Sequence, residues 1–223
     1  MKLRNGIFMM GIMMGTAAVM CAANIGAGVP IEVKQAAGAA GEFHWNWHDA
    51  QTLRDDDALR GAKVAKEERH AIADAIEVQL RPILGELGKT LAMEVREASL
   101  ETRVKLIDLD NDGMPEVIAE AADSCNDLGN CHIWIFKKSG QEYKLILDSI
   151  GQTFTVQATS TNGVKDIVVA MRESASEFNL KEYHYEDEKY KRASCHHADW
   201  EAAAGQTAEK LKEPRITPCV DGQ

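Results

Sequence analysis

The nine-residue stretch 108–116 contains four acidic side chains in a pattern that suits a cation site. The pattern is D-x-D-x-D-G-x-x-E, and its carboxylates belong to Asp108, Asp110, Asp112 and Glu116. Alternate side chains of such a loop converge on one point when the backbone curls around it, and Gly113 permits the sharp turn. The carbonyl oxygen of Met114 and the carboxylate of Glu116 would complete the shell. Because these ligands are all oxygens, the sequence predicts calcium. Magnesium needs stricter octahedral geometry, and zinc takes His or Cys.

Two other interpretations of this loop remain open. Asp, Asn and Gly are common turn formers, so the segment could be an acidic turn that binds no ion. Asp108 and Glu116 could also form an acid–base pair if their surroundings separated their pKa values. A loop of this type needs its carboxylates ionised as ligands, so we expect a structural ion and not a catalytic centre.

The segments around the loop predict an α+β fold in which N-terminal helices precede an antiparallel β-meander. Apolar residues at spacings of three and four indicate a helix from about residue 66, which Pro82 disturbs and which Gly85 and Gly88 end. A second, shorter helix is expected over 91–100. The period then changes to two, and the expected strands are 103–109, 116–121, 132–138, 143–150, 152–159, 164–171, 178–186 and, as one further candidate, 190–195. Short turns between successive strands indicate antiparallel neighbours.

The loop differs from an EF-hand, because position twelve is Ala119 instead of a bidentate Glu and because its flanks are predicted strands. The stretch VKLIDLDNDGMPEVIAE resembles the strand–loop–strand calcium motif of FG-GAP/VCBS-type repeats, as in integrin-like propellers. The matching positions are Asp108, Asp110, Asp112 and Glu116, and the resemblance implies calcium held between two strands. A wider stretch, about residues 67–195, resembles a group of uncharacterised exported bacterial proteins through CNDLGNCHIWIF and TSTNG. That likeness implies a shared domain but no particular activity.

Four cysteines lie beyond the N-terminal segment, and an even count in an exported chain favours disulfides. They are Cys125, Cys131, Cys195 and Cys219. Of the three possible pairings we favour Cys125–Cys131, which would close the loop CNDLGNC, and Cys195–Cys219, which would tie down the C-terminal tail. Free thiols or metal ligands are the alternative.

The N-terminal residues 1–23 have the pattern of a secretory signal peptide, with Lys2 and Arg4 before an apolar stretch and small residues. A retained transmembrane anchor is the alternative. We expect a flexible leader over 24–48 and a single domain over 49–223. Without the signal, 23 basic residues face 35 acidic ones, a formal charge of −12 that is poorly matched to nucleic acid or to anionic membranes. We expect no membrane span after cleavage, and a location in the bacterial periplasm or outside the cell.

Two histidine clusters are secondary candidates. Cys195 with His196 and His197, or His44 with His48, could bind a transition metal, and Cys195 with a histidine could form a nucleophilic pair. Adjacent residues on a strand point to opposite faces, which weakens a shared site. The sequence therefore predicts an exported, non-enzymatic domain with structural calcium that binds an unidentified envelope protein or glycan. A cell-envelope hydrolase and a periplasmic transition-metal-binding protein are the alternatives.

Overall fold

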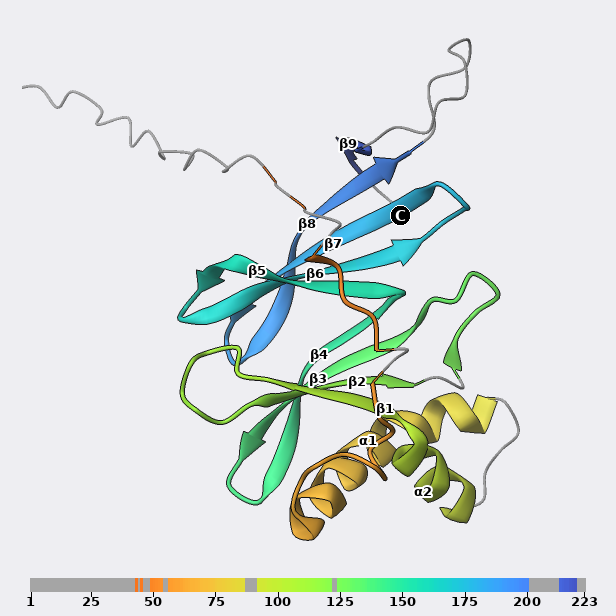
Figure 1. Ribbon diagram of the computed structural model, residues 1–223, viewed down its shortest axis with the longest axis vertical. Coiled ribbons are helices and arrows are strands. Elements are labelled where there is room, and N and C mark those ends of the chain that lie inside the picture. Colours follow the sequence, from red (N-terminus) through yellow and green to blue (C-terminus); the bar gives the residue numbers. More distant parts are fainter. Residues whose placement is uncertain are drawn as a thin grey trace, which may run out of the picture. The chain divides into compact units, whose positions relative to one another are not determined.

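In the computed structural model, two helices precede two antiparallel sheets of four and five strands (Figure 1). The structure describes residues 43, 45, 49–53, 56–86, 92–121, 124–200 and 213–219. The helices are α1 (Lys66–Glu86) and α2 (Ala92–Glu101). The strands are β1 (Arg103–Ile107), β2 (Glu116–Ala121), β3 (Cys131–Ser139), β4 (Glu142–Gly151), β5 (Thr153–Thr161), β6 (Val164–Arg172), β7 (Glu177–Glu186), β8 (Lys189–Asp199) and β9 (Arg215–Pro218). The predicted α+β class is confirmed.

All of these elements belong to one compact unit, His44–Gln223. The expected signal peptide lies outside the described residues, as does the expected leader apart from Phe43 and Trp45. Neither helix in the described part of the chain combines the length and the hydropathy of a membrane span.

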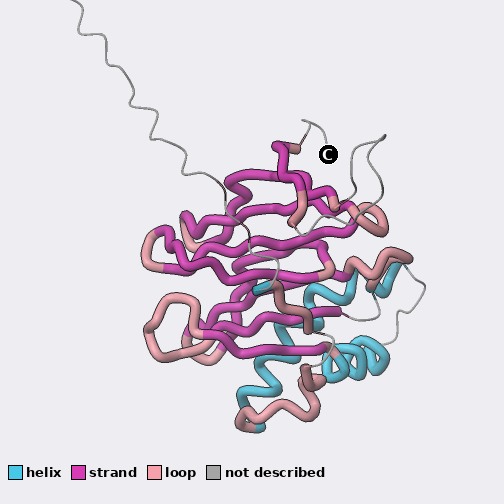
Figure 2. The backbone as a smooth tube through the Cα atoms, turned by 45° about the horizontal axis from the view of Figure 1, so that its top comes forward, coloured by secondary structure: helices cyan, strands magenta, loops and turns pink. Residues whose placement is uncertain are grey.

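The first sheet, with strand order β1-β2-β3-β4, is covered on one face by the helices. Ile72, Ile76 and Leu80 recur at helical spacing along α1, and they pack in one buried cluster with Trp134 and Phe136 of β3. In Figures 1 and 2 both helices lie beside this sheet. The aromatic strand HIWIF is therefore explained by a core position under α1, and Trp134 is only 1% exposed.

The opposite face of the first sheet packs against the second sheet, whose strand order is β5-β6-β7-β8-β9. Ile118 and Ile133 from the first sheet share a buried cluster with Phe154, Ile167 and Val169 from the second. The unit therefore has three layers: helices, sheet and sheet. Burial on both faces explains why every residue of β2 is buried.

The chain crosses from the first sheet to the second at Gly151, the last residue of β4. A Cβ atom at this position would collide with the Cγ1 atom of Val169 and would lie 2.9 Å from the carbonyl oxygen of Ala170. Only glycine leaves room for β4 and β6 to approach this closely.

Helix α1 continues further than the sequence indicated. It passes through Pro82 and Gly85 and ends at Glu86, so the expectation that Gly85 stops the helix is wrong; Gly88 lies outside the described residues. Proline leaves the carbonyl of Val78 without its helical N–H partner, but Val78 is 63% exposed and water can replace that partner.

Both cysteine pairs favoured from the sequence lie at disulfide distance. Cys125–Cys131 closes the loop before β3, and Cys195–Cys219 joins β8 to the residue after β9. The backbone N–H of Cys219 also donates to the carbonyl oxygen of Cys195 at 3.0 Å. The second disulfide therefore reinforces the pairing of β9 with β8, which the sequence did not predict.

Candidate metal site

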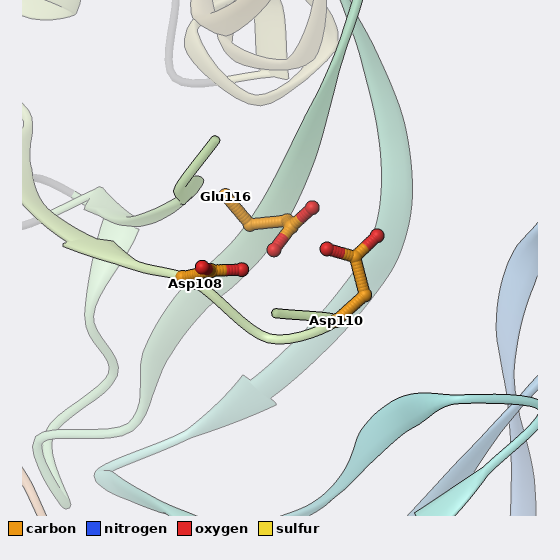
Figure 3. A group of neighbouring side chains, drawn as sticks. All are labelled: Asp108, Asp110 and Glu116. Atoms are coloured by element: carbon orange, nitrogen blue, oxygen red, sulfur yellow. The ribbon is translucent and has the colours of Figure 1, made fainter. Parts of the chain in front are cut away.

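Three acidic side chains of the predicted loop converge between β1 and β2. Asp108, Asp110 and Glu116 each offer a carboxylate oxygen, and these oxygens lie within 4.8 Å of one another (Figure 3). In the described part of the chain this is the one group of His, Cys, Asp or Glu side chains that meets this geometry. The structure thus brings together three of the four predicted carboxylates.

The loop backbone is curled by residues in the left-handed region. Asn111 and Gly113 have φ values of 58° and 86°. The N–H of Gly113 donates to Asp108 Oδ2 at 3.1 Å, and the N–H of Asp112 donates to Asp110 Oδ1 at the same distance. These hydrogen bonds hold both aspartate side chains against the backbone of the loop.

The remaining predicted ligands, Asp112 and Met114, have different positions. Asp112 Oδ1 accepts the N–H of Met114 at 2.7 Å, so this carboxylate caps the turn and is not one of the three that converge. Met114 is 51% exposed. Any contribution of this residue to a cation shell would come from its carbonyl, as predicted for the seventh position.

Glu116 anchors the loop from the first residue of β2. It is only 2% exposed, and its Oε2 accepts the N–H of Leu109 at 2.8 Å. Burial raises the pKa of this carboxyl, and the charge of Asp110 acts in the same direction. A buried carboxylate is stable only with a compensating charge nearby.

One such charge comes from Lys137 of β3, which the sequence did not indicate as part of the site. Its ammonium contacts Asp110 Oδ2 and lies 3.6 Å from Glu116 Oε1. Burial opposes the charge of Asp110, but the hydrogen bonds from Lys137 and from the Asp112 amide outweigh it, and the pKa of Asp110 is lowered. Burial also opposes the charge of Lys137, yet its contacts with Asp110 and Glu116 raise the pKa of the ammonium.

A polar atom at the centre of the loop still has no partner. Asp108 Oδ1 is buried and, within the described residues, accepts no hydrogen bond. Burying an ionised oxygen without a partner costs free energy, and a coordinated cation would remove that cost. The donor set of three carboxylates therefore fits a hard divalent cation, and it contains none of the nitrogen or sulfur ligands that zinc prefers.

The histidine clusters do not form a comparable site. His196 and His197 face opposite sides of β8: His196 Nε2 lies 3.0 Å from Ser194 Oγ, whereas His197 Nδ1 lies 3.2 Å from Asn179 Oδ1. His44 and His48 lie outside the described residues. Cys195 lies at disulfide distance from Cys219, as the favoured pairing predicts, so its sulfur is not available for the alternative use as a nucleophile.

A polar chain on β7 and β8 joins Ser194 to His196 and Glu182. Ser194 Oγ donates to Glu182 Oε2 at 2.7 Å, and the other carboxylate oxygen lies 3.2 Å from His184 Nε2. In a serine hydrolase the imidazole accepts the serine proton, whereas here the carboxylate does. His184 thus lies beside a carboxylate, as the hydrolase alternative expects, whereas the hydroxyl of Ser194 donates to Glu182.

Comparisons with protein families, with curated proteins and with solved structures give no significant match to this chain. The likeness to FG-GAP/VCBS repeats and to exported bacterial proteins therefore stays a prediction.

Proposed function

We propose that this protein is an exported, non-enzymatic domain that binds calcium in the loop 108–116 and uses the ion to hold its two sheets together. The observation that carries the proposal is the convergence of Asp108, Asp110 and Glu116, together with the buried oxygen of Asp108 that lacks a partner. We further propose that the calcium-bound domain binds an envelope protein or a glycan.

The charge balance of the loop supports a divalent ion. Three converging carboxylates face one ammonium, that of Lys137, so the cluster keeps a formal charge of −2 in the ion-free state. Calcium takes six to eight oxygen ligands in a flexible geometry, so carboxylates, a backbone carbonyl and water can share the shell. A structural ion also explains why carboxylates are placed where β1 turns into β2.

Export is supported by the disulfides. Two cysteine pairs at disulfide distance fit an oxidising compartment such as the periplasm or the cell exterior. Calcium sites of extracellular modules bind with dissociation constants of roughly 10⁻⁴–10⁻³ M. Weak binding of this order would suffice for occupancy there.

Calorimetric titration of the ion-free protein with calcium tests the proposal. We expect one site with a dissociation constant of roughly 10⁻⁴–10⁻³ M, and weaker binding of magnesium. Asp110→Asn keeps the shape of the side chain and removes its charge, so it should weaken calcium binding at least about tenfold. Asp127→Asn changes the same charge on an exposed residue outside the loop and should have no effect. Equal calcium affinity in both variants would refute the assignment of the loop.

A further inference from the structure

A second candidate site is a pocket of about 240 Å³ beside the acidic loop. It lies between the β3–β4 hairpin and the β7–β8 hairpin, and four lysines contribute to its lining: Lys137, Lys138, Lys144 and Lys189. Two acidic residues, Asp187 and Glu188, also line it, and Asp187 is already paired with Lys191. The lysines outnumber the acidic residues of the lining on a chain whose formal net charge is −10, although two of the four lysines are paired with acidic residues outside the pocket.

The lysines of the pocket differ in what they contact. Lys138 is paired with Glu68 at 2.8 Å, and Lys137 is engaged by the acidic loop. Lys144 and Lys189 are exposed, and neither forms an ion pair within the described part of the chain. These two come from different hairpins, so their ammonium groups are available to an anion that enters from solvent.

Lys137 belongs to both sites, because it lines the pocket and contacts the loop carboxylates. A calcium ion coordinated by Asp110 and Glu116 would occupy the oxygens that the ammonium now contacts, at ligand distances of about 2.3–2.6 Å. Like charges repel at such range, so the ammonium would have to leave. Its flexible four-carbon stem allows it to turn toward the pocket that it already lines.

We propose that this pocket binds a small anionic ligand, one bearing a carboxylate, phosphate or sulfate group, and that calcium strengthens the binding by releasing Lys137 into the pocket. The inference rests on the proposed calcium site. Linkage is reciprocal, so the anion also strengthens calcium binding by the same factor. Calcium in the loop would then set the affinity of the pocket for its anionic ligand, in addition to stabilising the fold.

The test uses sulfate as the probe and follows backbone amide signals by NMR at constant ionic strength. One titration uses protein made calcium-free with a chelating resin, and a second uses protein saturated with calcium. We expect shifts at the two hairpins, and an affinity for sulfate at least about fivefold higher with calcium. Lys137→Met should make the two affinities equal, and the double variant Lys144→Met/Lys189→Met should lose sulfate binding in both conditions. Lys63→Met, which removes one charge at an exposed site away from the pocket, should behave as the unmodified protein.

Two failures are distinguishable. If calorimetry shows normal calcium binding but sulfate binds equally well with and without calcium, the inference is refuted and the proposed function stands. If calcium does not bind the unmodified protein, the proposed function is refuted, and the linkage falls with it. Persistence of the calcium effect in Lys137→Met would also overturn the role given to this lysine.

Discussion

In the ion-free protein the ammonium of Lys137 balances the charge of the loop carboxylates, and in the calcium-bound protein we expect the ion to do so. Replacing Lys137 with methionine removes only the first of these compensating charges. Methionine keeps most of the side-chain length and removes the ammonium. At the observed 3.6 Å between Lys137 Nζ and Glu116 Oε1, two unit charges interact by about 1 kcal/mol in bulk water and by about 4–5 kcal/mol at an effective dielectric constant of 20. The lysine side chain is 29% exposed, so solvent screens the pair and we expect a net loss of about 1–2 kcal/mol in the ion-free protein.

The same substitution should strengthen calcium binding. In the unmodified protein calcium must displace an ammonium that stabilises the free loop, and the variant no longer has this competitor. A difference of about 1–2 kcal/mol corresponds to a calcium affinity higher by roughly fivefold to thirtyfold. The calcium-bound variant and the calcium-bound parent should therefore differ less in stability than their ion-free forms.

Urea unfolding with and without calcium, together with calorimetry, measures both effects. The matched control is Lys138→Met, which removes the neighbouring ammonium of the same strand but breaks a contact with Glu68 of α1 instead. That variant should lose stability equally in both conditions and keep its calcium affinity. The reasoning is refuted if Lys137→Met leaves the ion-free stability unchanged, or if the two variants respond to calcium alike.

Three further predictions concern the scaffold. Removing the Cys195–Cys219 disulfide by a double Cys→Ser change should lower the free energy of unfolding by roughly 3 kcal/mol, and removing Cys125–Cys131 should lower it by roughly 2 kcal/mol. Removing the first disulfide costs more because its cysteines are 24 positions apart in the sequence, against 6 for the second. Urea unfolding that ranks the two variants in the reverse order would contradict this. Hydrogen bonds from Lys138 and Tyr143 lower the pKa of Glu68 below its usual 4.5, so its contribution is present above pH 4.5 and is lost as pH falls through the lowered pKa. Glu68→Gln should thus destabilise the protein at pH 7 but hardly at pH 2, and a pH-independent effect in acid and urea titrations would count against the contact. Gly151→Ala should lower the free energy of unfolding by about 1–3 kcal/mol, because the new Cβ would collide with β6. Gly85→Ala should raise it by up to about 1 kcal/mol, because a Cβ there has nothing within 4 Å and alanine favours the helix. Thermal unfolding measures both effects.

The sequence predicted the elements well because their hydrophobic periods are regular. The strand expected over 116–121 matches β2, and those expected from 132 to 186 differ from β3–β7 by at most two residues at an end. It did not show that the strands divide into two sheets, since a period of two says which residues share a face but not what covers that face. The burial of β2 on both faces is a tertiary effect. Strand β9 is four residues long and contains Pro218, so no periodicity could identify it.

The acidic side of the site was predictable from spacing, but its basic side was not. Asp110 and Lys137 are 27 residues apart, and only the antiparallel pairing of β2 with β3 brings them together. A weak signal was available in the sequence, because Lys137 follows directly on the apolar run IWIF. A lysine held in such a position needs an acidic partner, and the four loop carboxylates needed a counter-charge.

The position of the loop explains why an ion there would stabilise both layers. Leu109, the second residue of the acidic segment, is fully buried in the core between the sheets, and its carbonyl oxygen accepts the N–H of Lys165 of β6 at 2.8 Å. Ordering the loop therefore orders a hydrogen bond between the first sheet and the second. At a calcium concentration ten times the dissociation constant, binding should add about 1.4 kcal/mol to the stability of the folded state.

Hydrogen exchange locates this effect. The measurement is made under conditions in which amides exchange by local opening. If the ion orders the contact between layers, calcium should slow the exchange of the Lys165 amide more than it slows the exchange of amides in the middle of α1. Asp110→Asn should abolish the difference, and Asp127→Asn should preserve it. Uniform slowing of all slowly exchanging amides would instead mean that calcium stabilises the fold only globally, and that the Leu109–Lys165 bond has no special part in coupling the loop to the second sheet.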